Sequence, residues 1–191
     1  MKWLGHHLIR QSEKQTGEQS DFIRDMLDAS RGAFWKFGLF IPMARHKGPL
    51  PGAAIHAARI AAVHAEDCGP CLQTTINNAA HDQVDPAILR ALVEGNVEAL
   101  DLQTRTVFLF ARALVARDLE AETYRAQIER WWGKAGLTEI ALAVAATRVF
   151  PTVKRAMDYG EACLRVTIAR ETTSTVKATS PRPRLTAQPV N

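Results

Sequence analysis

The sequence AARIAAVHAEDCGPCLQ, at residues 57–73, contains the signals that decide the fold. Residues 53–65 are rich in alanine and contain no glycine or proline, so they favour a helix. Asp67 then offers a capping side chain, and Pro70 is tolerated only in the first turn of a helix because it lacks a backbone N–H. This stretch predicts two successive helices with a short break between them, the second starting near Cys68 and ending near residue 81.

Similar start and stop signals predict further helices on either side of this pair. Asp85 followed by Pro86 indicates a helix start, and Gly95 indicates its end. Pro151 is expected to end or kink an apolar helix. The other helices are expected at about residues 21–30, 102–116, 118–133, 137–149 and 153–169. No alternating strand pattern of sufficient length is present, so we predict an all-α fold.

The composition divides the chain into three parts. Residues 1–17 are polar and unpatterned, and we expect a flexible N-terminal arm there. Residues 18–170 form the predicted helical domain. Residues 171–191 are rich in Thr, Ser, Pro and Arg, and we expect them to be disordered. The formal net charge is only +4, part of it in this last segment, so we expect no nucleic-acid partner.

The sequence also bears on the cellular compartment. The first residues contain no apolar run of signal-peptide length, and no stretch reaches the about 20 apolar residues that a membrane helix needs. The three cysteines, two of them in a C-x-x-C motif, do not make the disulfide framework of a secreted protein. We therefore expect a cytoplasmic protein that does not bind membranes.

The C-x-x-C motif of Cys68 and Cys71 is the strongest chemical signal in the sequence. The thiolate is the reactive form of cysteine, and its pKa falls at a helix N-terminus because unpaired N–H groups favour negative charge. Two cysteines three residues apart in a first helical turn can form a reversible disulfide. The alternatives are a coincidental spacing and a zinc site completed by Cys163 and a histidine, but no second C-x-x-C or C-x-x-H motif is present. We therefore predict neither a metal nor a cofactor.

Several polar residues near the dithiol are candidates for proton transfer. His56 and His64 titrate near neutrality. If helical geometry continued through the break, His64, Cys68, Cys71 and Thr75 would share one face. Glu66 is either a further relay group or a carboxylate that complements the dipole of the second helix. The predicted catalytic residues are Cys68, Cys71, His56, His64, Glu66 and Thr75.

Residues 57–73 resemble the core helix pair of AhpD-like proteins in the carboxymuconolactone-decarboxylase superfamily, and AAHDQVDPAIL at 79–89 resembles the next helical step in that family. The resemblance covers roughly residues 30–168 and is specific at the dithiol helix. It implies a helical bundle and a homo-oligomer (dimer, trimer or hexamer). It also implies a peroxidase in which Cys71 attacks the peroxide, Cys68 resolves the sulfenic acid, and a Glu/His relay moves protons. Helix-dipole reasoning instead favours Cys68 as the more reactive thiolate.

Only the cysteines match among the catalytic positions of that family. Thr75 stands where the family has its relay histidine, His56 replaces the relay glutamate, and Pro70 replaces the histidine before the second cysteine. We treat His56, His64 and Glu66 as candidate substitutes. Since the dithiol favours redox chemistry over lactone decarboxylation, we predict a thiol-dependent hydroperoxide reductase or a disulfide oxidoreductase. Its partners would be a small-molecule hydroperoxide and a thiol reductant. The alternatives are a non-catalytic oligomeric protein of this fold, a carboxymuconolactone decarboxylase-type enzyme, and a metal-binding module.

Overall fold

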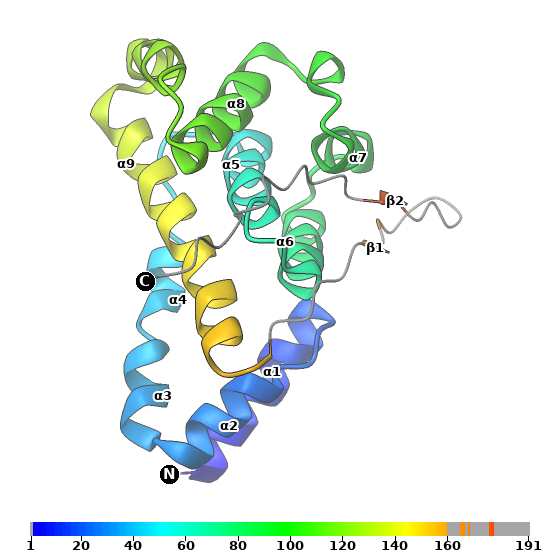
Figure 1. The fold of residues 1–191 in the computed structure, drawn as a ribbon, viewed down its shortest axis with the longest axis vertical. Coiled ribbons are helices and arrows are strands. Elements are labelled where there is room, and N and C mark those ends of the chain that lie inside the picture. Colours follow the sequence, from blue (N-terminus) through cyan, green and yellow to red (C-terminus); the bar gives the residue numbers. More distant parts are fainter. Residues whose placement is uncertain (1, 160–164, 167, 169–175, 178–191) are drawn as a thin grey trace, which may run out of the picture.

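The computed structural model describes residues 2–159, 165–166, 168 and 176–177, and it confirms the predicted all-α fold. In chain order the α-helices are α1 (Lys2–Thr16), α2 (Asp21–Ala29), α3 (Arg31–Phe37), α4 (Phe40–Ala44), α5 (Gly52–His64), α6 (Gly69–His81), α7 (Pro86–Glu94), α8 (Leu102–Ala116) and α9 (Ala121–Ala156). A 3-10 helix, η1 (Val97–Ala99), follows α7, and β1 (Arg165–Val166) pairs antiparallel with β2 (Val176–Lys177). Figure 1 shows α5 and α6 between α9 and α7, with α1–α3 at the end of the molecule away from α8.

The helix pair predicted at the dithiol is present as α5 and α6. The N-cap residue of α6 is Cys68 and not the predicted Asp67, and Pro70 lies in the first turn. Asp67 has a φ of 50°, a left-handed conformation that aspartate tolerates better than most residues. A hydrogen bond between His56, early in α5, and Asp82, which caps the end of α6, shows that α6 folds back along α5.

Helix α5 is the centre of the main hydrophobic core. It is buried on most sides and packs against α8, α9 and α6. Its many alanines allow close approach, because the distance between two packed helices depends on the size of the side chains at the contact. The fully buried side chains of this core include Ile60, Val63, Ile76, Leu89, Leu92, Val107, Ile128 and Ile140.

The prediction of a flexible arm at residues 1–17 is wrong, because residues 2–16 form the helix α1. This helix packs against α2 and α6, and Asn77 of α6 donates its side-chain N–H to the Thr16 carbonyl oxygen at 2.6 Å. A second, smaller core contains Ile9, Met26, Leu27 and Phe34. A mostly polar helix of this length is marginal by itself and is stabilised by tertiary packing, which the local sequence does not reveal.

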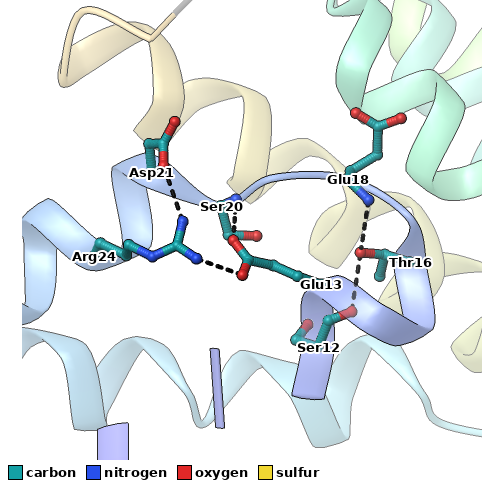
Figure 2. A network of polar contacts seen from close by, with 7 residues as sticks. All are labelled: Ser12, Glu13, Thr16, Glu18, Ser20, Asp21 and Arg24. Carbon is teal, nitrogen blue, oxygen red and sulfur yellow. Dashed lines mark hydrogen bonds and ion pairs between the residues drawn. The ribbon is translucent and has the colours of Figure 1, made fainter. Parts of the chain in front are cut away.

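A polar network holds the corner between α1 and α2 (Figure 2). Glu13 accepts hydrogen bonds from the backbone N–H of Ser20 at 2.8 Å and from the guanidinium of Arg24 at 2.5 Å. The Thr16 hydroxyl donates to the carbonyl of Ser12 at 3.0 Å. Ser12, Thr16 and Ser20 also line the cavity described below, so this corner shapes the candidate site.

Helix α9 joins two helices that the sequence predicts separately. Residues 118–133 and 137–149 were expected to form individual helices divided at Gly133. In the structure they belong to one element with non-helical dihedral angles at Gly133 (φ 62°, ψ −162°). The predicted break at Gly133 is therefore confirmed, because α9 consists of two helical segments that meet at a kink there. Glycine adopts this positive φ without the steric cost that a side chain would add.

The last predicted helix, at residues 153–169, is confirmed to Ala156, where α9 ends, and is wrong at the described residues 157–159 and at 165–166, which form β1. Pro151 was expected to end or kink the preceding helix, but it is buried within α9 and the helix continues past it. Proline fixes φ near the helical value, so packing can hold such a residue despite the missing N–H. Asp158 then turns the chain with a φ of 63°. The tail predicted at 171–191 lies outside the described residues except for β2.

Among the described residues, α9 is long and apolar enough to cross a membrane by length and composition. The core helix of a soluble protein meets the same criteria, and α9 packs against α4, α5 and α8. The absence of membrane binding therefore stays a prediction.

Candidate dithiol site and its cavity

The two cysteines of the motif form a disulfide at the N-terminus of α6. The Cα atoms of Cys68 and Cys71 are 5.2 Å apart, and the bond spans the first turn of the helix. Cys68 is the N-cap residue and is buried, with 6% of its surface exposed. Cys71 is only partly buried. The structure thus brings the predicted pair together and gives its two members different exposure.

A cavity of about 410 Å³ is lined by Cys71, whereas Cys68 is not among its described lining residues. Cys71, Thr75, Asn78 and Asp82 follow one another at intervals of three or four residues, so one face of α6 forms a wall of this cavity. The other walls come from α5, from the α1–α2 corner, from α4 and its following loop, and from α9. A cavity of this size can accommodate a small organic molecule.

His56 lies in the cavity wall at the far end from the disulfide. Its side chain is 1% exposed, and Nε2 is 2.9 Å from a carboxylate oxygen of Asp82. Burial lowers the pKa of His56 by more than the hydrogen bond to Asp82 raises it, so near neutral pH the uncharged ring donates from Nε2.

The distance from His56 to the disulfide rules out direct proton transfer. Asp82 comes eleven residues after Cys71, and a rise of about 1.5 Å per helical residue puts their Cα atoms about 16 Å apart. The sulfur of Cys71 is bonded to Cys68, on the side away from Asp82. The proposed relay from His56 to the dithiol therefore needs a molecule between them.

Thr75 lies one turn after Cys71 and also lines the cavity. Its hydroxyl donates to the backbone carbonyl of Cys71 at 2.9 Å. The hydroxyl oxygen can still accept a hydrogen bond from a bound molecule, but its proton is already engaged. Thr75 is therefore placed to contact a substrate, and it does not reproduce a histidine relay.

His64 is not among the described residues that line the cavity. It is partly buried, and its Nε2 has no hydrogen-bond partner among the described residues. Burial and the charge of Arg112 on α8 lower the pKa of His64, against an opposing effect of Asp67. Because α6 folds back along α5, the shared face predicted for a continuous helix through His64 and Cys71 does not form.

Glu66 is held by two arginines of α9. Its carboxylate accepts a hydrogen bond from Arg148 Nε at 2.5 Å and another from Arg155, which also donates to the Glu66 carbonyl at 2.6 Å. Burial raises the pKa of Glu66, but the hydrogen bonds and charges of the two arginines lower it by more. The pKa is therefore below its usual value, and the carboxylate stays ionised. Glu66 thus anchors the turn before the dithiol to α9 and is unsuited to the predicted proton relay.

Sequence reasoning missed two residues of the site, Asp82 and Arg59. Arg59 lines the cavity one turn after His56 in α5, and its guanidinium donates to the Ala44 carbonyl at 3.0 Å. Its Nε has no hydrogen-bond partner among the described residues. The spacing of Asp82 from Cys71 was a usable signal, since eleven residues are three helical turns and place both on one face. The partners of Arg59 depend on the packing of α4 and α5.

The alternative of a metal site finds no support within residues 2–159, where no group of three or more His, Cys, Asp or Glu side chains is placed to hold a metal ion. Cys163, named above as a possible fourth ligand, lies outside the described residues.

No protein-family model, no curated protein and no solved structure matches this chain. The resemblance of residues 57–73 to AhpD-like proteins therefore stays a prediction, and so do the oligomer and the peroxidase activity that it implies. The dithiol and its cavity remain as the basis for a function.

Proposed function

We propose that this protein is a thiol-dependent reductase of small organic hydroperoxides. The observation behind the proposal is that a disulfide-forming pair at a helix N-terminus opens, through Cys71, onto a cavity of about 410 Å³. The cavity admits a small organic molecule, and the helix N-terminus favours the thiolate form that redox chemistry requires.

Access and electrostatics give the two cysteines different roles. Cys71 lines the cavity, so its sulfur is the one that a bound hydroperoxide meets. Cys68 occupies the N-cap position, where a side chain can accept the N–H of the third helical residue, here Cys71. A Cys68 thiolate is therefore stabilised in the reduced protein, which suits it to resolve an intermediate on Cys71 and to leave when the disulfide is reduced.

The reaction then balances with a hydroperoxide as oxidant and a thiol as reductant. The Cys71 thiolate attacks the terminal peroxide oxygen, the O–O bond breaks, and the alkoxide takes a proton from water to leave as an alcohol. The Cys68 thiolate attacks the sulfur of the Cys71 sulfenic acid, forming the disulfide and releasing hydroxide, which becomes water. Two reductant thiols then restore both cysteines in two exchange steps and leave as a disulfide.

Stopped-flow oxidation with thiol counting tests this proposal. Reduced protein is mixed with an organic hydroperoxide, and we expect two protein thiols to disappear for each hydroperoxide converted to alcohol. Added thiol reductant should restore both. If the folded protein loses thiols no faster than the same protein in denaturant, the proposal is wrong.

A disulfide oxidoreductase that does not use peroxide is the second candidate. The positions of the predicted relay groups favour this candidate, because neither group can pass a proton to the dithiol directly. Glu66 is hydrogen-bonded to two arginines, and His56 lies at the other end of the cavity. Exchange of thiols at Cys71 needs no such relay, since Cys68 leaves as a thiolate. Rapid exchange with a small disulfide, combined with slow hydroperoxide reduction, would decide for this candidate.

A further inference from the structure

The end of the cavity opposite the dithiol is rich in positive charge. Among the described residues, the cavity is lined by the cations Arg45, Lys47, Arg59 and Lys154 and by the carboxylates Glu18 and Asp82. Asp82 is already hydrogen-bonded to His56. The described lining residues therefore carry more positive than negative charge, and Arg59 and Lys47 are close enough to act on the His56–Asp82 pair.

Arg59 and Lys47 are the cations at this end. Arg59 is fixed by its hydrogen bond to Ala44, and the charges of Arg59 and Lys47 both act on His56 and Asp82. A fixed guanidinium matches the geometry of a carboxylate, and a partly buried one is screened less by salt than a surface charge. This end has the composition of a carboxylate-binding site.

His56 holds Asp82 in place at this end of the cavity. The His56 side chain is 1% exposed, and its Nε2 donates to the Asp82 carboxylate at 2.9 Å. Its Nδ1 is buried without accessible surface, so a molecule in the cavity does not reach this atom. The direct ligand contacts at this end therefore come from Arg59 and Lys47.

We propose that Arg59 and Lys47 bind the carboxylate of a chain-like substrate whose other end reaches Cys71, while His56 holds the neighbouring Asp82 in place. The ligand class is an amphipathic carboxylate with its reactive group at the end of a flexible apolar chain. Ile23, Ile41 and Phe150 supply apolar surface in the cavity for that chain. This inference rests on the proposed function, because it assigns the substrate class of the same dithiol. The shared chemistry fits either a carboxylate-bearing hydroperoxide or a carboxylate-bearing thiol reductant.

Octanoate is the probe for the carboxylate site, because it binds without reacting. Calorimetry with the full-length Cys71→Ser protein should show saturable octanoate binding and none of comparable strength for octanol. Arg59→Gln should weaken octanoate binding at least about tenfold, the effect expected for loss of a hydrogen bond between charged groups. Arg130→Gln, which removes an exposed positive charge elsewhere, should bind as before. Equal binding of octanoate and octanol, or no binding of either, overturns the proposal.

A second variant protects the test from a folding defect in Arg59→Gln. Lys47 is exposed, so Lys47→Gln should fold normally and still bind octanoate several-fold more weakly. Unchanged affinity in Lys47→Gln and Arg59→Gln together would contradict the assignment.

Matched reactive pairs identify the source of the carboxylate. Hydroperoxyoctanoate is compared with its methyl ester as oxidant, and mercaptooctanoate with its methyl ester as reductant. A preference for either acid that disappears in Arg59→Gln supports the inference and names the source, and equal rates within both pairs overturn it. Octanoate binding is measured without turnover, so an inactive protein that binds octanoate would refute the proposed function and leave the carboxylate site standing.

Discussion

The two ends of the cavity lie on one face of α6 but are built in different ways. The dithiol end depends on consecutive residues, in which Cys68 caps the helix and Cys71 closes its first turn. The opposite end is assembled from His56 and Arg59 of α5, Asp82 after α6, and Lys47 before α5. The comparison teaches that reactive chemistry can be local in sequence while recognition depends on how helices pack.

The largest expected effect concerns the dithiol end. Cys71→Ser and Cys68→Ser should each lower thiol-dependent hydroperoxide turnover by about 1000-fold or more, because each removes one of two sulfurs that act as a unit. Cys163→Ser should keep turnover close to that of the unchanged protein. Steady-state consumption of hydroperoxide measures all three variants. Turnover that depends on Cys163 instead of the pair would remove the dithiol end from the mechanism.

The next effect concerns the anchor of the dithiol turn. Glu66→Gln should lower the free energy of unfolding by about 2 kcal/mol near neutral pH, since it removes the charge that two arginines share. Glu98→Gln, which changes the exposed pair with Arg105, should cost about 0.5 kcal/mol or less. Denaturant unfolding measures both, and equal losses would show that the Glu66 contact is no stronger than a surface pair.

The pH dependence of this effect has a definite sign. The pKa of Glu66 is lowered from 4.5 in the folded protein, so its contribution is present above that pH and is lost as the pH falls through the folded pKa. The stability gap between the unchanged protein and Glu66→Gln should therefore close at acid pH. A gap that stays constant down to about pH 2 would contradict the assignment of ionised Glu66.

A bulky substitution between the two ends of the cavity tests whether an organic substrate occupies both ends at once. Thr75→Trp should slow the reduction of an organic hydroperoxide by about tenfold, which corresponds to about 1.4 kcal/mol of activation free energy. It should slow the reduction of hydrogen peroxide much less. The indole would occupy the cavity between Cys71 and the carboxylate end, while a small oxidant still reaches the sulfur. Thr75→Val keeps the shape of the side chain and serves as the control. Equal slowing of both oxidants would mean that the organic substrate does not use this cavity.

The smallest effect concerns the buried histidine of the opposite end. The pKa of His56 is lowered from 6.5, so neutral His56 stabilises the fold above that pH, and stability is lost as the pH falls towards the folded value. Between about pH 7 and about pH 5, the unchanged protein should lose stability more steeply than His56→Gln, by at most about 1.4 kcal/mol per pH unit. Parallel profiles would show that His56 is charged or solvated in the folded protein.

The elements that the sequence predicts well have local signals. The start and end of α7 follow from Asp85, Pro86 and Gly95, and the α5–α6 pair follows from alanine content and Pro70. The dithiol belongs to the same class, because both cysteines lie within one helical turn.

The elements that the sequence predicts poorly depend on distant contacts. Helix α1 is stabilised by a small core shared with α2 and α3, and Glu66 meets arginines more than eighty residues away. The pairing of His56 with Asp82 requires the relative placement of α5 and α6, which no local pattern encodes. Because of these contacts, Glu66 is unsuited to the proton-relay role expected for it, and His64 does not share a helix face with Cys71.

The most direct test compares the two sulfurs one at a time. Reduced Cys68→Ser and Cys71→Ser proteins are treated with a small organic hydroperoxide, and the sulfenic acid is trapped and located by peptide mass spectrometry. We expect rapid formation on Cys71 in the Cys68→Ser protein and little on Cys68 in the Cys71→Ser protein, because Cys71 is the cysteine that lines the cavity. Faster oxidation of Cys68 would contradict the claim that substrate reaches the dithiol through this cavity.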